Sequence, residues 1–171
     1  VFFHSEEPPF AIPGMSDRMP YESTVYSAMD EGMTGTYMKT FRRKIREAVE
    51  SFQPDLILCH HLYLVTALTR DCVREIPVFG FCHNTDLRQM RKHDLQREFI
   101  CSRIGKLDGI FALHQEQKKE ILKVYPVEES RVRIAGTGYN DRIFFRKGEK
   151  PAAAPVRLAF AGKVRQEKGV A

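Results

Sequence analysis

The feature that most constrains the fold is a regular alternation of short apolar runs with segments of helical periodicity. The apolar runs cover residues 55–59, 76–82, 109–113 and 131–135, and each has the length of a buried strand. Apolar side chains at helical spacing predict helices over 37–52, 62–74, 86–92, 94–104 and 115–124. Strands that alternate with helices form βαβ units, so we expect an α/β fold with a parallel sheet and helices on both faces.

The end of the chain differs in character from the rest. Residues 146–155 are largely polar, with prolines at positions 151 and 155, which predicts a linker. A new strand follows at 156–161. We therefore expect one domain over 1–145, incomplete at its N-terminus, and the first strand and turn of a second domain over 156–171. The chain has no initiator Met and stops inside an expected helix, so we expect a fragment cut at both ends.

Composition excludes several classes of protein. No window approaches the roughly 20 apolar residues of a membrane-spanning helix. The four cysteines lack the spacing of a zinc site, which favours free thiols in a reducing compartment and a cytoplasmic location. The net charge of +5 is modest, and the basic helices carry no aromatic platform. We expect no nucleic-acid partner, while a peripheral contact with an anionic membrane stays open.

Histidines follow the predicted strands. Five of the six stand directly after an apolar run expected to form a strand: His4 after residues 1–3, and His60, His61, His83 and His114 after three of the runs given above. The carboxyl ends of parallel strands share one edge of the sheet, where ligands bind, so we expect these side chains to converge there. For any single histidine, a hydrogen bond at a strand end is the plainer alternative. We expect no metal, because the spacing supplies no carboxylate ligands, although adjacent His60 and His61 keep that option narrowly open.

Two local motifs suggest binding of anions or hydroxyl groups. In the segment 83–89, Thr85 or Asp86 can cap a helix that starts near Leu87 and aims its amide groups at the sheet edge. A plain cap with solvated charges is the alternative. In 162–169, cations stand in a strand-to-helix turn, which suggests phosphate binding, with a solvated charge run as the alternative. Gly136-Thr137-Gly138 lets a ligand approach the backbone, but the dinucleotide-binding fingerprint is incomplete.

Together, the motifs resemble a known family in order and spacing. The segments concerned are 54–62, 77–89, 136–140 with Phe145, and 162–163 with 167–170. They are similar to the retaining glycosyltransferases of the glycogen synthase-like type, glycosyltransferase family 4, which have the GT-B fold. Residues 14–17 with 19–21 look like a loop of the acceptor domain in one branch of that family. The resemblance covers nearly the whole chain.

The resemblance implies a hexosyltransferase with two Rossmann-like domains and a cleft between them. The N-terminal domain would carry the acceptor site, and the C-terminal domain would bind the nucleotide-diphosphate sugar. The sugar would pass to a hydroxyl of a carbohydrate or lipid-linked acceptor with retention of configuration, and without a cofactor. On this pattern, the fragment alone would be inactive, because half of the cleft is missing.

The resemblance also implies roles for individual residues. His83 would lie beside the transferring sugar, with Asp86 and Arg88 shaping its loop. The other expected contacts are His61, His114, Gly138 and Tyr139 with the substrate, and Lys163 and Lys168 with the donor diphosphate. The family commonly has glycine where this chain has Asn84, and arginine where it has Lys163, whose point charge holds phosphate less strictly.

Two other functions remain open at this stage. A sugar-nucleotide epimerase on a related scaffold would release an epimerised sugar without an acceptor. A non-catalytic module that binds carbohydrates or anions would lose only affinity when His83 or Lys168 is replaced.

Overall fold

The computed structural model describes residues 8–145 and residue 148. The chain divides into two compact units, Val1–Thr137 and Gly138–Ala171. All the described helices and strands belong to the first unit, and they are, in chain order, η1 Tyr26–Ala28, α1 Glu31–Phe52, β1 Ile57–His60, α2 Leu64–Cys72, β2 Val78–Phe81, α3 Thr85–Lys92, α4 Arg97–Ile104, β3 Gly109–Ala112, α5 Gln115–Val124, η2 Glu129–Arg131 and β4 Val132–Ile134. The predicted α/β fold is confirmed, and the strands and helices predicted between residues 37 and 135 are all present.

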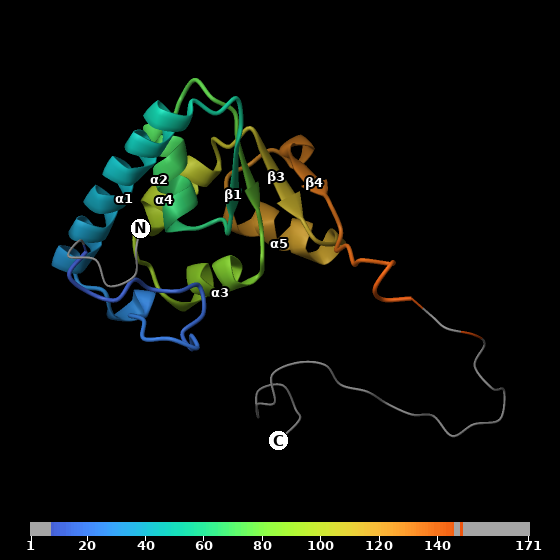
Figure 1. Ribbon diagram of the computed structural model, residues 1–171, viewed down its shortest axis with the longest axis horizontal. Helices are drawn as coiled ribbons and strands as arrows, with labels where there is room; N and C mark the ends of the chain where they lie inside the picture. The colour runs from blue at the N-terminus through green and yellow to red at the C-terminus, as the bar shows by residue number, and fades with distance from the viewer. Residues whose placement is uncertain (1–7, 146–147, 149–171) are drawn as a thin grey trace, which may run out of the picture. The chain divides into compact units, whose positions relative to one another are not determined.

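The four strands form one parallel sheet in the order β1-β2-β3-β4. Parallel strands are joined by right-handed crossovers, and a sheet whose order follows the chain then places every crossover helix on the same face. The side chains agree, since Val78, Ile110 and Val132 lie on this face and are buried. Figure 1 shows α1, α2 and α4 gathered to one side of the strands.

The opposite face of the sheet is aromatic. Phe81 stacks on Phe111 with ring centroids 4.7 Å apart, and Phe79 stacks on Phe111 at 6.0 Å. These rings are only partly buried, and Leu58 on the same face is 47% exposed. The expected helices are therefore present on one face, and the described part of the chain supplies none for the aromatic face.

The first helix begins earlier than the periodicity predicts. Asp30 caps α1 by accepting a hydrogen bond from the backbone N–H of Met33 at 2.7 Å, so the helix starts at Glu31. It ends where Gln53 takes left-handed backbone angles, just before Pro54. Tyr37, on the inner side of α1, is buried against the rest of the core.

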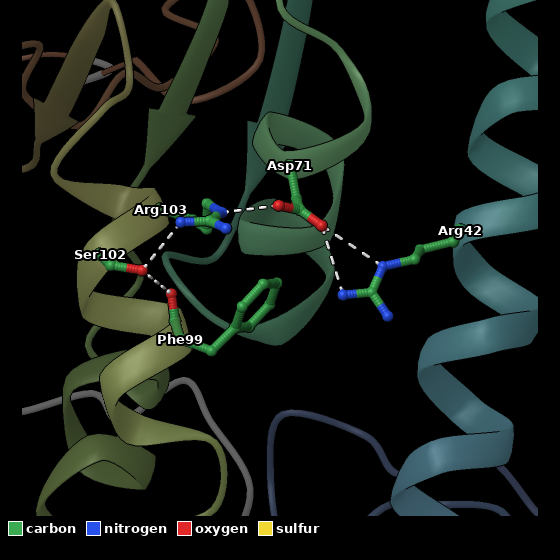
Figure 2. A network of polar contacts seen from close by, with 5 residues as sticks. All are labelled: Arg42, Asp71, Phe99, Ser102 and Arg103. Atoms are coloured by element: carbon green, nitrogen blue, oxygen red, sulfur yellow. Dashed lines mark hydrogen bonds and ion pairs between the residues drawn. The ribbon is translucent and has the colours of Figure 1, made fainter.

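An ion-pair network joins α1, α2 and α4 (Figure 2). Asp71 of α2 accepts hydrogen bonds from Arg42 of α1, at 3.3 Å and 3.4 Å, and from Nε of Arg103 of α4, at 2.7 Å. The guanidinium carbons of the two arginines lie 5.5 Å and 5.3 Å from the centroid of the Phe99 ring, within cation–π range. One carboxylate and one ring therefore connect three helices.

Candidate functional site

Three histidines meet at the carboxyl edge of the sheet, as predicted. His60 is the last residue of β1, His61 follows it, and His83 comes just after β2. Nδ1 of His60 lies 2.9 Å from Nε2 of His83, which is a hydrogen bond. The ring of His83 is centred 5.1 Å from that of His60 and 4.7 Å from that of His61. Polar rings from two neighbouring strand ends thus form one group, which we call the histidine cluster.

His61 has an unusual backbone, with φ of 70°. A residue with a Cβ atom adopts this conformation only when its surroundings hold it there. Here the backbone N–H donates to the carbonyl oxygen of Phe81 at 2.8 Å, and the hydroxyl of Thr66 donates to the carbonyl oxygen of His61 at 2.5 Å. Its Nδ1 lies 3.3 Å from the hydroxyl oxygen of Thr85. The loop after β1 is thereby fixed at the point where the cluster forms.

Burial lowers the pKa of His61, because it disfavours the charged imidazolium. The carboxylate of Asp86 acts in the opposite direction but more weakly, and the neighbouring rings of His83 and His60 lower the pKa further. His61 is therefore a neutral imidazole at neutral pH. A neutral ring offers one nitrogen donor and one nitrogen acceptor, which suits a ligand hydroxyl.

Asp86 holds two loops together from inside. Its side chain is completely buried, and its carboxylate accepts hydrogen bonds from the backbone N–H groups of Leu62 at 2.7 Å, His83 at 3.2 Å and Leu87 at 3.1 Å. The thiol of Cys82 also donates to it at 3.4 Å. A buried carboxylate requires such donors, and these come from the loops after β1 and β2 and from the first turn of α3. Asp86 therefore shapes the site through the backbone that it holds.

The expected helix cap in this motif is wrong. The helix α3 begins at Thr85, and its cap residue is Asn84, whose side chain makes no capping hydrogen bond. The carboxylate of Asp86 is instead drawn inward by the buried amide groups. Asn84 has a φ of 63°, so the position where the family commonly has glycine does require a left-handed backbone. Asparagine tolerates this conformation better than most residues.

A buried glutamine connects the next loop to the same edge. The side-chain amide of Gln117 donates from Nε2 to Oδ1 of Asn84 at 2.8 Å and accepts at Oε1 from the backbone N–H of Leu113 at 2.7 Å. His114 caps α5, because its Nδ1 accepts a hydrogen bond from the backbone N–H of Gln117 at 3.2 Å. Among the described side chains, His114 reaches the histidine cluster through Gln117 and Asn84, without a ring contact of its own.

The loop at 14–17 packs against α3. The side-chain nitrogen of Gln89 donates to the carbonyl oxygen of Met15 at 3.2 Å and to the carboxylate of Asp17 at 2.9 Å, and Lys92 forms an ion pair with Asp17. The hydrogen bonds from Lys92 and Gln89 lower the pKa of Asp17. Arg88 stands on α3 with an exposed side chain. The helix that follows the cluster thus also carries the loop that resembles an acceptor-domain loop.

The remaining predicted residues lie elsewhere. Gly138 and Tyr139 belong to the second unit, in which Tyr139 is 75% exposed. His4, Lys163, Lys168 and the strand expected at 156–161 are outside the described residues, as is the expected linker 146–155 apart from Gly148. Their roles stay predictions.

Two residues of this edge were not among the predicted site residues, namely His60 and Gln117. His60 follows a predicted strand like the other histidines, so the same pattern includes it. Gln117 carries no sequence pattern of its own, because its role depends on the partner that the fold brings to it.

The described residues contain no group of three or more histidine, cysteine or acidic side chains arranged to hold a metal ion. Within the same part of the chain, no helix is long and apolar enough to cross a membrane.

The chain matches a model of a known protein family. The family model described as Glycosyltransferase Family 4 matches residues 16–142, which run from the loop against α3 through all four strands. No curated protein sequence matches the chain.

Proposed function

Because the chain belongs to glycosyltransferase family 4, we propose that it forms the acceptor-side domain of a hexosyltransferase. The enzyme moves a sugar from a nucleotide-diphosphate donor to a hydroxyl of a carbohydrate or lipid-linked acceptor, with retention of configuration. The observation that carries this proposal is the meeting of His60, His61 and His83 at the carboxyl edge of a parallel sheet. Ligands of open α/β sheets bind outside this edge.

The proposed chemistry assigns separate tasks to the two ends of the chain. Transfer breaks the bond between the anomeric carbon and the diphosphate, and forms a bond from that carbon to the acceptor oxygen. The acceptor hydroxyl gives up its proton to the departing diphosphate. Negative charge grows on the diphosphate, where Lys163 and Lys168 would stabilise it without a metal. His83 would position the sugar by hydrogen bonding, and the neutral ring of His61 would bind a hydroxyl. We nominate no general base.

The surroundings of the site support these roles. A ring or backbone group that stabilises a transition state must already be in place when charge develops. The loop that carries His83 is fixed by Asp86 on one side and by the bond between Asn84 and Gln117 on the other. The free state of all four cysteines suits a reducing compartment, so we also propose a cytoplasmic location.

The test is turnover in the intact protein that contains this chain. A panel of nucleotide sugars is screened by thermal shift and then by transfer to a mixture of acceptors. We expect His83→Ala to lower kcat by about 100-fold or more, the usual loss when a positioned donor is removed. Lys119→Ala, on the exposed side of α5, is the matched control and should keep the wild-type rate.

Three outcomes would contradict the proposal. The first is a His83→Ala variant that keeps the wild-type rate. The second is a wild-type protein that binds its ligands without turnover and whose His83→Ala variant loses only affinity for them. That result would indicate a binding module. The third is release of an epimerised sugar in the absence of an acceptor, which would indicate an epimerase.

A further inference from the structure

His60 is held in one orientation although it is exposed to solvent. Its ring stacks on that of Phe81, with centroids 5.5 Å apart and an angle of 14° between the planes. Phe81 in turn stacks on Phe111 at 4.7 Å. His60 and Phe81 are also direct partners in the register of β1 and β2, so the backbone fixes both ends of this stack. An exposed side chain on the outer strand of the described sheet is thereby ordered before any ligand arrives.

The ordered ring makes one directed contact, from its Nδ1 to Nε2 of His83 at 2.9 Å. A hydrogen bond of this length holds one proton between the two nitrogens. Either His60 donates and His83 carries its proton on Nδ1, or His83 donates from Nε2. Both arrangements keep Nε2 of His83 engaged. In the described part of the chain, no hydrogen bond reaches Nδ1 of His83, which is thus the nitrogen left for a ligand.

The backbone and the second face of His83 are fixed as well. Its N–H donates to both oxygens of Asp86 at 3.2 Å, and the ring of His61 lies 4.7 Å away, centroid to centroid. The hydrogen bond to His60 therefore sets the side-chain torsion angles of His83. A hydrogen bond at one nitrogen of an imidazole determines which nitrogen remains for a ligand.

We propose that His60 is the positioning residue for His83, holding Nε2 of that ring so that Nδ1 faces the sugar or acceptor. The ligand named here rests on the proposed function, whereas the orientation of the ring does not. Residues that orient a metal-binding histidine through its other nitrogen change affinity or activity by about 10- to 100-fold when they are replaced, and we expect the lower end of that range for a histidine without a metal. His60 thus acts on the reaction through another side chain.

The test uses two polar replacements that differ by one methylene group. In His60→Asn, the amide occupies the place of Nδ1 and can still bond to Nε2 of His83. In His60→Gln, the amide extends toward the place of Nε2 of His60 and away from His83. Leu58→Ala, two residues earlier on the same face of β1, is the control, because Leu58 is exposed and leaves the contact between the two histidines intact.

Two readouts are made on each intact variant. Turnover should fall in His60→Gln by about tenfold or more in kcat, with KM for the donor changed by less than about threefold, while His60→Asn stays within about threefold of wild type. Nitrogen-15 spectra of the histidine rings should give a single protonation pattern for His83 in the wild type and in His60→Asn. In His60→Gln, we expect the averaged signals of a ring that exchanges between its two neutral forms.

The ring spectra keep the two proposals separate. If the protein transfers no sugar at all, the proposed function fails, and the spectra still decide whether His60 orients His83. Unchanged His83 signals in His60→Gln would overturn the positioning role whatever the rates. If both His60 variants turn over at equal rates while the His83 signals change in only one of them, the orientation of His83 does not affect the reaction. That result would overturn the proposed effect of His60 on kcat.

Discussion

Two residues at the carboxyl edge, His61 and Asn84, hold their backbones in the left-handed region, with φ of 70° and 63°. For a residue with a Cβ atom this conformation costs about 1–2 kcal/mol relative to the right-handed one. The strain is kept at the loops after β1 and β2, which carry the histidine cluster. Contacts hold each strained residue in this conformation. For Asn84, the contact is the hydrogen bond from Gln117 at 2.8 Å.

The first prediction separates the backbone of Asn84 from its side chain. We expect Asn84→Val to lower the free energy of unfolding by about 2 kcal/mol, because a β-branched residue tolerates this conformation poorly. Asn84→Gly should cost less than about 1 kcal/mol, since glycine relieves the backbone and loses only the bond to Gln117. Urea unfolding of the two variants measures both values. Equal losses would show that the contact with Gln117, and not the backbone, is what the position requires.

At the scale of elements, the junction of α1, α2 and α4 depends on charges near helix ends. Arg70 and Arg103 stand in the last turns of α2 and α4, where cations complement the negative end of the helix dipole. Asp71 then links this end of α2 to both neighbours, as Figure 2 shows. Burial alone would raise the pKa of Asp71, but the hydrogen bonds and charges of Arg103 and Arg42 outweigh it and lower the pKa.

The second prediction concerns this carboxylate. We expect Asp71→Asn to lower the free energy of unfolding by about 1 kcal/mol, a partly exposed network being worth somewhat more than a single surface pair. Because the pKa is lower in the folded state, the contribution is complete above the ordinary value of 3.8 and is lost as the pH falls through the folded value. The difference between wild type and variant should therefore shrink below pH 3.8.

Glu47→Gln is the control for Asp71→Asn. Glu47 pairs with Arg43 and Lys44 on the exposed side of α1, where solvent screens the charges, so its loss should cost clearly less stability than that of Asp71. Urea unfolding at several pH values measures both variants. A Glu47→Gln loss as large as that of Asp71→Asn would mean that the junction contributes no more than an ordinary surface pair.

Over the whole molecule, two partly buried histidines tie stability to pH. Burial lowers the pKa of His61 and of His93 below the ordinary value of 6.5. Below that value the unfolded chain takes up protons that the folded chain resists, so the free energy of unfolding falls as the pH drops from 6.5 through the folded values. Well above 6.5 both states are neutral at these rings and the effect is absent.

The third prediction uses the double variant His61→Gln with His93→Gln, which removes both titrating rings. Between about pH 7.5 and about pH 5.5, we expect the wild type to lose more stability than the double variant, as measured by urea midpoints. Parallel curves for the two proteins would show that these rings do not resist protonation in the folded state.

Much of this architecture is predictable because its periodicities are local. The alternation of apolar runs and helical spacing located all four strands, and the geometry of parallel strands then brought His60, His61 and His83 to one edge. The aromatic face could not be foreseen from the run at 76–82. A continuous apolar run is typical of a strand buried on both faces. The same run also occurs in this strand, where Phe79 and Phe81 on one face are only partly buried.

The polar details depended on long-range partners. The sequence indicated a helix cap at Thr85 or Asp86. The carboxylate of Asp86 instead accepts hydrogen bonds from backbone N–H groups of two loops, those of Leu62 after β1 and of His83 after β2. The roles of Gln117 and His60 likewise arise from residues that only the folded sheet places beside them. Such choices follow from tertiary packing, which local propensity does not encode.

The order of the sheet, in which each strand pairs with its neighbour in the chain, also bears on how the protein is made. Each described strand after β1 has its partner already synthesised, and the pairing spans only the crossover between the two strands, which keeps the sequence separation of these contacts lower than a mixed strand order would. The described strands can therefore begin to pair during translation, from β1 toward β4, while the domain completes its fold as a unit.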